Sequence, residues 1–231
     1  NPGRSRLPCK LEREPIMTIH TEFLTIDPGK RPWVEMYELM NSIVQPRPIA
    51  WISTISAKGV HNLAPFSYFS ICSLNPPIIS NSIFYKRDGS EKDTLVNIKA
   101  TRRYVVGTVS LDVVAKANQS SAGYASDIDE FVEADIKYVD RGPNAPRLVA
   151  ESPVQLMCEL YQLIKLGEGA GAGTLVLGQV KEVLLSRKLE NISWEKDGVP
   201  PDIKNNEGRM AADYYAKTSE LIPLPRPTTK K

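Results

Sequence analysis

The sequence predicts a mainly β protein: an antiparallel barrel, closed or nearly closed, with a few short helices added to it. Short runs of β-branched and aromatic residues recur along the chain, with turn residues between them. The 18 prolines and 14 glycines are many for a helical bundle and suit a chain that turns often. Near the end, two long apolar stretches flank a glycine-rich segment, which predicts one long hairpin.

The composition is that of a folded globular domain. Of the 231 residues, 42% are hydrophobic and 24% are charged, so a buried core is feasible. The net charge of +2 gives no basic field that would attract nucleic acid. No apolar run approaches the ~20 residues that cross a bilayer. We therefore expect no nucleic-acid partner and no membrane partner.

The cysteines indicate free thiols rather than a metal site. The three cysteines and two histidines are widely spaced and include no CxxC pair, whereas structural zinc needs four clustered ligands. Cys72 and Cys158 lie in apolar stretches and are expected to be buried. Because this usage of cysteine favours a reducing compartment, we expect a cytoplasmic protein.

Both ends of the chain are predicted to be arms. Residues 1–35 mix prolines with charges and show no sustained period, which predicts an extended N-terminal arm. Acidic residues within 1–16 argue against a mitochondrial presequence. Met17 is a candidate native start, with 1–16 then non-native or an upstream extension. The predicted main domain spans 36–220, and 221–231 form a proline-rich C-terminal arm.

The first half of the main domain is expected to hold most of the short strands. In order, we expect a turn of helix at 36–40, a strand at 49–56, a turn at 57–59, a returning strand at 60–64, an apolar stretch at 65–74 ended by 75–77, a strand at 78–85, a turn at 86–89, and a helix at 91–100 capped by Ser90.

The second half is expected to hold the long hairpin. In order, we expect a strand at 104–109, a short helix at 111–118 capped by Ser110, an irregular segment at 123–150, strands at 154–166 and 174–185, and a helix at 209–218.

The glycine run at 167–173 is the first candidate site. Its pattern partly fits a dinucleotide fingerprint, which requires a strand before it and a helix after it. The following segment, 174–180, is strand-like, and no Lys-Ser or Lys-Thr pair follows to form a P-loop. The run is therefore interpreted as a flexible hairpin loop.

Hydroxyl and aromatic side chains mark two further segments. Ser53 and Thr54 interrupt an apolar strand, either as solvent-facing positions or as hydroxyls directed at a phosphate or polyol. A second segment mixes flat rings with small hydroxyls, which suits either a mixed barrel strand or the wall of a pocket for a flat heteroaromatic ligand. It comprises Ser67, Tyr68, Phe69 and Ser70.

The start of the helix after Ser90 is a candidate phosphate site. Free backbone N–H groups and the positive end of the helix dipole lie there, and Lys92 and Thr94 can add to them. The alternative is ordinary capping, with Asp93 in the first turn.

The C-terminal segment carries a guanidinium and phenols that can approach a ligand, in Arg209, Tyr214 and Tyr215, with Asp213 beside them. Packing of a C-terminal helix is the alternative. With two histidines in the chain, we expect no Ser-His-Asp or Cys-His constellation.

Four motifs occur in a fixed order. They are Pro-Arg-Pro-Ile-Ala-Trp-Ile-Ser-Thr at 46–54, Gly-Val-His-Asn-Leu-Ala-Pro-Phe-Ser-Tyr-Phe at 59–69, Asn-Pro-Pro at 75–77, and Lys-Asp-Thr-Leu-Val-Asn-Ile at 92–98. In this order and spacing they resemble the flavin reductase-like, FMN-binding split-barrel family. Segments 129–131 and 151–153 agree more loosely, and the resemblance covers residues 40–220.

The resemblance implies a split β-barrel of antiparallel, Greek-key-like topology that forms a homodimer and binds FMN noncovalently near the subunit interface. Ser53 and Thr54 would face the ribityl and phosphate side, and 67–70 would follow the isoalloxazine edge. Lys92 and Thr94, with Asp93 between them, would hold the phosphate, and Arg47 is a further candidate. Segment 209–215 resembles the closing motif of the family, but residues 210–212 are Met-Ala-Ala where a paired glycine is common.

The function that the resemblance implies is an NAD(P)H-dependent flavin reductase that passes electrons to a small-molecule acceptor. No catalytic side chain is expected, because the flavin carries the chemistry. An FMN-binding electron carrier without nicotinamide activity and a catalytically silent scaffold are the alternatives. Pyridoxamine phosphate oxidation, which uses a similar architecture, fits the motifs less well. The choice between NADH and NADPH, the acceptor, and whether FMN is a tight cofactor or a substrate stay open.

Overall fold

The computed structural model describes residues 23–189 and 206–217. The chain divides into two units, Asn1–Pro32 and Trp33–Lys231. In the first unit, a 3-10 helix spans Pro28–Lys30, and the Asp27 carboxylate caps it by accepting from the Gly29 N–H at 3.0 Å. The expectations for 1–16, Met17 and 221–231 lie outside the described residues.

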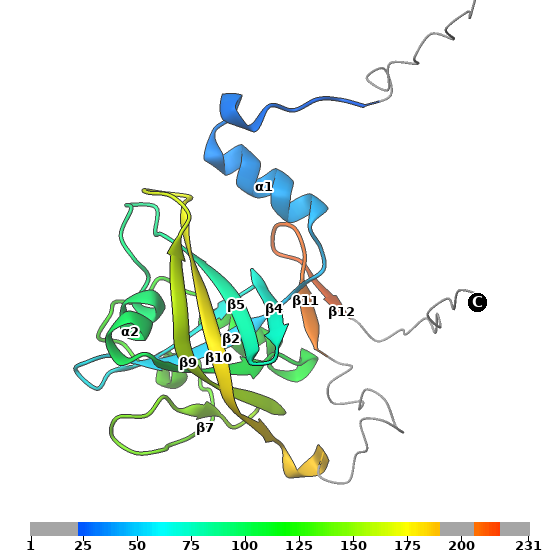
Figure 1. Cartoon of the computed structure of the whole chain (residues 1–231). Coiled ribbons are helices and arrows are strands. Elements are labelled where there is room, and N and C mark those ends of the chain that lie inside the picture. Colours follow the sequence, from blue (N-terminus) through cyan, green and yellow to red (C-terminus); the bar gives the residue numbers. More distant parts are fainter. Residues whose placement is uncertain (1–22, 190–205, 218–231) are drawn as a thin grey trace, which may run out of the picture. The chain divides into compact units, whose positions relative to one another are not determined.

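The second unit is mainly β, with short helices (Figure 1). Its helices are α1 (Trp33–Ile43), α2 (Asp93–Thr101), the 3-10 turn η3 (Leu111–Val113), α3 (Val114–Gln119), α4 (Glu130–Glu133) and the 3-10 turn η4 (Arg187–Leu189). Its strands are β1 (Arg47–Pro48), β2 (Ala50–Ile55), β3 (His61–Phe66), β4 (Phe69–Leu74), β5 (Pro77–Phe84), β6 (Arg103–Thr108), β7 (Tyr138–Val139), β8 (Leu148–Val149), β9 (Val154–Lys165), β10 (Gly173–Leu185), β11 (Glu207–Arg209) and β12 (Tyr215–Lys217).

Seven antiparallel strands form one sheet that must curl. Their order is β3-β2-β6-β9-β10-β5-β4, so β3 and β4 are the two edges. Yet only Ser67 and Tyr68 join the end of β3 to the start of β4. The strand ends are thus three residue steps apart, which span at most about 11 Å. The two edges therefore lie close together without pairing, which gives a barrel split along one seam, as predicted.

The barrel has two hydrophobic cores, one on each face of β2. Ala50 and Ile52 belong to the inner core, which α2 covers with Leu95 and Ile98. Trp51 belongs to the outer core beneath α3 and α4, and its indole N–H donates to Ser120 Oγ at 2.9 Å. Because both faces are covered, every residue of β2 is buried.

Most of the predicted strands are confirmed. The hairpin of β2 and β3, the strands β5 and β6, and the long β9–β10 hairpin lie where the sequence predicts them. The glycine run at 167–173 joins β9 to β10 and precedes a strand, which confirms the hairpin loop and excludes the dinucleotide motif there. Helix α1 is longer than the turn expected at 36–40, and 123–150 also holds α4, β7 and β8.

The helix predicted at 209–218 is wrong in the described part of that segment. Residues 207–217 form a hairpin of β11 and β12 instead, and β1 pairs with β11 so that Arg47 lies opposite Arg209. Tertiary pairing with β1 decides the structure of this short segment, and its own periodicity does not.

Two capping predictions and one burial prediction are also wrong. The Ser90 hydroxyl donates to Asp88 within the preceding turn, and α2 begins after Lys92 without a side-chain cap. Ser110 precedes its helix, but its side chain makes no capping bond. Cys158 is buried as expected, whereas Cys72 is exposed, because it lies at a register shift on the edge strand β4.

None of the helices in the described ranges is both long and apolar enough to cross a membrane.

Candidate functional site

The link between β3 and β4 lies in a groove, called here the main groove, with a volume of about 480 Å³. It brings together three of the predicted site residues, Ser67, Tyr68 and Lys92, with the end of β3 and part of α1. Its full lining is Trp33, Val34, Tyr37, Glu38, Pro65, Phe66, Ser67, Tyr68, Ser82, Phe84, Tyr85, Lys86, Arg87, Lys92 and Gly171.

Aromatic side chains form one wall of the main groove. The Tyr68 and Phe84 rings lie 4.7 Å apart between centroids. The Tyr68 hydroxyl donates to Asn41 Oδ1 at 2.7 Å, which fixes the ring against α1. Burial, with a smaller contribution from Tyr37, raises the pKa of the Tyr68 phenol, so this side chain stays neutral. The wall can pack against a flat ring.

Positive charge gathers at one end of the main groove. Lys86, Arg87 and Lys92 line it together. Lys86 pairs with Asp93 at 3.2 Å, whereas none of the described carboxylates forms an ion pair with Lys92. Its ammonium lies 5.7 Å from the centre of the Phe66 ring. The pKa of Lys92 is lowered mainly by loss of hydration from the surrounding protein and, to a smaller extent, by the charge of Lys86. An anion bound here would therefore stabilise the charged ammonium.

Lys92 also lies at the start of α2, where backbone donors point outward. Asp93 and Thr94 open this helix, and their N–H groups have no acceptor within it. An anion beside Lys92 would therefore meet both a side-chain charge and the positive end of the helix.

Thr54 and Thr94 meet behind the main groove in a buried network. Asn62 Nδ2 donates to Thr54 Oγ1 at 3.2 Å and to Thr94 Oγ1 at 3.0 Å, and Asn97 Nδ2 donates to Thr54 at 3.1 Å. All four side chains are buried. The two threonines therefore anchor α2 to the barrel, and phosphate binding by Thr94 stays a prediction.

Arg47 is held by the protein itself. Its guanidinium donates to the carbonyls of Asn41, Val44 and Met210, at 2.8 to 3.0 Å, and Nε donates to Ser67 Oγ at 3.3 Å. It is buried and joins α1, the β11–β12 hairpin and the β3–β4 link. Arg47 thus holds the segments that surround the groove in place.

Seven of the ten predicted site residues do not line the main groove: besides Arg47, Thr54, Asp93 and Thr94, these are Ser53, Phe69 and Ser70. Ser53 is fully buried in β2, so the solvent-facing alternative is wrong for it, and its Oγ has no partner among the described residues. Phe69 packs against the inner core. Ser70 is exposed on the edge strand, and its hydroxyl donates to the carbonyl of Ile71.

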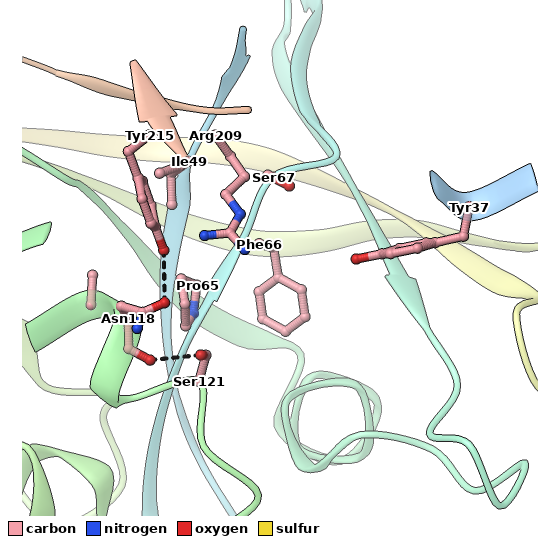
Figure 2. Close-up of a pocket in the computed structure, with 10 residues that line it drawn as sticks. Tyr37, Ile49, Pro65, Phe66, Ser67, Asn118, Ser121, Arg209 and Tyr215 are labelled. Carbon is pink, nitrogen blue, oxygen red and sulfur yellow. Dashed lines mark hydrogen bonds between the residues drawn. The ribbon is translucent and has the colours of Figure 1, made fainter. Parts of the chain in front are cut away.

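A smaller groove adjoins the main one and is called here the Arg209 groove (Figure 2). Its volume is about 200 Å³, and it shares Tyr37, Pro65, Phe66 and Ser67 with the main groove. Arg209 and Tyr215 bring the guanidinium and phenol that the sequence suggested, but from strands rather than a helix. The guanidinium carbon lies 4.6 Å from the centre of the Tyr215 ring.

Sequence reasoning missed the lining that comes from α1 and from the turn after β5. Trp33 and Tyr37 fall in or beside the segment predicted to be an arm, and Lys86 and Arg87 fall in a segment that the sequence predicts only as a turn. The cluster of three basic residues within 86–92 was the available signal.

Among residues 23–189 and 206–217, no group of His, Cys, Asp and Glu side chains is arranged to hold a metal ion.

Comparison with known proteins agrees with this fold and these motifs. Residues 40–200 match the family model described as a flavin reductase like domain. An uncharacterized protein of Aquifex aeolicus is 32% identical over 184 residues, covering 79% of this chain and 89% of that protein.

Two solved structures extend the likeness to three dimensions. Nitrilotriacetate monooxygenase component B from Bacillus cereus superposes with a TM-score of 0.79 at 30% identity, covering 87% of this chain and 98% of that one. A protein assigned as a flavin reductase with a split barrel domain, from Shewanella frigidimarina, superposes with a TM-score of 0.68 at 19% identity, covering 86% and 96%.

Proposed function

The chain belongs to the flavin reductase-like domain family, and on that premise we propose that it binds FMN in the main groove and works as an NAD(P)H-dependent flavin reductase. The observation that carries the proposal is the pairing of an aromatic wall at Tyr68 and Phe84 with the cationic end at Lys92 in one groove. A phosphorylated flat-ring ligand needs these two features together.

The main groove fits FMN in size and donor chemistry. Its volume of about 480 Å³ lies within the range usual for cofactor sites. Lys86, Arg87 and Lys92 supply the charge that a phosphate requires. Ser82 Oγ is buried at the groove and has no hydrogen-bond partner among the described residues. A polar atom of a bound ligand would provide that partner.

Each part of the groove has a role in this proposal. Lys92 and the first N–H groups of α2 bind the phosphate, and Asp93 holds Lys86 beside them. Tyr68, fixed by Asn41, supports the flat ring, while Arg47 holds the β3–β4 link in place. The bound flavin would supply the electron-transfer chemistry, so the protein contributes binding and orientation.

We further propose that the protein is a cytoplasmic homodimer whose second copy covers α1. Asn41 is the one buried residue of this helix, whereas Val34, Tyr37, Met40 and Ile43 are exposed. An amphipathic helix with so much exposed apolar surface favours a partner. Because Tyr37 also lines the main groove, a partner on α1 would help to close it.

The proposed binding site is tested by titrating the purified protein with FMN and with riboflavin, which lacks the phosphate, and following flavin fluorescence. We expect both to bind and FMN to bind at least about tenfold more tightly, since charge-assisted phosphate contacts are lost with riboflavin. Equal affinities would contradict the phosphate end, and no binding of either would favour the silent scaffold.

A further inference from the structure

The Arg209 groove contains a cation with an unused donor. Arg209 Nη2 donates to the carbonyl of Ala212 at 2.7 Å and lies 3.6 Å from the carboxylate of Asp213. Arg209 Nη1 is buried and has no partner among the described residues. Because leaving a buried N–H unpaired is unfavourable, a ligand or water atom is expected beside it.

Flat side chains surround this cation. Figure 2 shows the guanidinium directed between the rings of Tyr215 and Phe66, with Tyr37 further along the groove. Tyr215 is fixed by its hydroxyl, which donates to Asn118 Oδ1 at 3.0 Å. Aromatic walls of this kind favour a planar ligand.

Asn118 adds further donors to the lining of this groove. Because Asn118 Oδ1 accepts from Tyr215, the amide Nδ2 is left with two N–H groups and no partner among the described residues. The described lining holds Arg209 and no Asp or Glu. A surplus of donors around one cation favours an anion that accepts several hydrogen bonds.

The size of the groove limits the ligand to one ring. Its volume of about 200 Å³ is below that usual for drug-sized ligands and less than half that of the main groove. A three-ring flavin needs the larger space, so the two grooves suit two different molecules.

We propose that the Arg209 groove binds a carboxylate borne on a single planar ring, as a second ligand next to the flavin. The carboxylate accepts from Arg209 Nη1, and the ring packs against Tyr215 and Phe66. The shared lining at Pro65, Phe66 and Ser67 places this ligand beside the main groove. That the neighbour is a flavin rests on the proposed function, whereas the carboxylate site rests on the Arg209 groove alone.

The test is calorimetric titration of the full chain with benzoate and with benzamide, its uncharged counterpart of the same shape, in the presence and absence of FMN. We expect one benzoate per chain and an affinity for benzamide at least about tenfold lower, because a charge-assisted contact is lost. The carboxylate assignment would be overturned if benzamide bound as tightly as benzoate, or if benzoate did not bind at all. This comparison uses the unaltered protein.

Two variants locate the site. Arg209→Gln should weaken benzoate binding at least about tenfold and leave the FMN affinity within about twofold. Arg141→Gln, at an exposed arginine outside both grooves, should change neither. Unchanged benzoate affinity in Arg209→Gln would overturn the proposal. If FMN does not bind but benzoate behaves as expected, the proposed function fails and the carboxylate site stands.

Discussion

Single residues at the main groove have roles that their neighbours determine. Lys92 is accessible to solvent but surrounded by protein on its other sides, with Lys86 nearby and no carboxylate paired to it in the described part of the chain. Thr94, two residues later, is buried and bonded to Asn62. The sequence motif singled out both residues, but only the contacts show that Lys92 lines the groove whereas Thr94 joins the helix to the barrel.

Replacing Lys92 by Ala should weaken FMN binding by about 1.5–3 kcal/mol, because a charge-assisted phosphate contact is lost. Lys99→Ala is the matched control, since Lys99 lies on the same helix and pairs with Glu91. Fluorescence titration with FMN measures both. Equal affinities for the two variants would place the phosphate elsewhere.

Glu130 makes stability depend on pH. Its carboxylate is buried and accepts from the Leu63 N–H at 2.9 Å. Burial raises its pKa above the ordinary 4.5, so the folded state holds the proton to higher pH than the unfolded state does. Its contribution to the free energy of unfolding is therefore greatest below pH 4.5 and declines as the pH rises through the raised folded pKa.

Glu130→Gln keeps an acceptor for Leu63 and removes this titration. The variant should gain stability relative to the unaltered protein as the pH rises from about 4 to 7. Denaturant unfolding at several pH values measures it, with Glu133→Gln, on the exposed side of the same helix, as the control. If the free energy of unfolding changes with pH in the same way for Glu130→Gln and the unaltered protein, titration of Glu130 does not cause the pH dependence.

Among the elements, local sequence patterns predict the structure correctly where the pairing segments are also neighbours in sequence. The β2–β3 hairpin follows from a β-rich run, a turn at 57–59 and a second run. The β11–β12 hairpin has no such signal, since β1, far away in sequence, provides its partner strand. The groove lining from α1 was missed for the same reason: it depends on long-range contacts such as that of Asn41 with Tyr68.

Close packing of a tyrosine side chain explains one glycine in the barrel. A Cβ at Gly178 of β10 would lie 1.7 Å from the hydroxyl of Tyr104, which is itself only 1% exposed. Gly178→Ala should therefore lower the free energy of unfolding by about 1–3 kcal/mol. Gly123→Ala is the control, because no atom lies within 4 Å of its added carbon. Urea denaturation that gives the same result for both variants would contradict this packing.

For the whole molecule, the split barrel follows from the sheet order together with the two-residue link between β3 and β4. The sequence predicted this architecture through the motif series, since composition alone reached only a barrel of many strands. It singled out Lys92 and, from the aromatic wall, Tyr68, both of which line the main groove. It did not separate the main groove from the Arg209 groove, because their boundary depends on how Phe66 and Tyr37 are placed.

The proposed dimer is tested by light scattering coupled to gel filtration. Ile43→Glu on α1, where the side chain is 63% exposed, should shift the mass towards one chain by placing charge in an apolar interface. Val132→Glu on α4, at 64% exposure, should leave the mass unchanged. A single-chain mass for the unaltered protein would exclude the homodimer.

The central claim is that this chain holds FMN for reduction by a nicotinamide. The most direct measurement is the visible absorbance of the FMN-loaded, filtered protein under anaerobic conditions, before and after NADH or NADPH is added. We expect flavin bands that stay with the protein and bleach when one of the two nicotinamides is present. Bound flavin that stays oxidised with both would contradict the reductase and leave the electron carrier, and a filtered protein without flavin bands would contradict the FMN site itself.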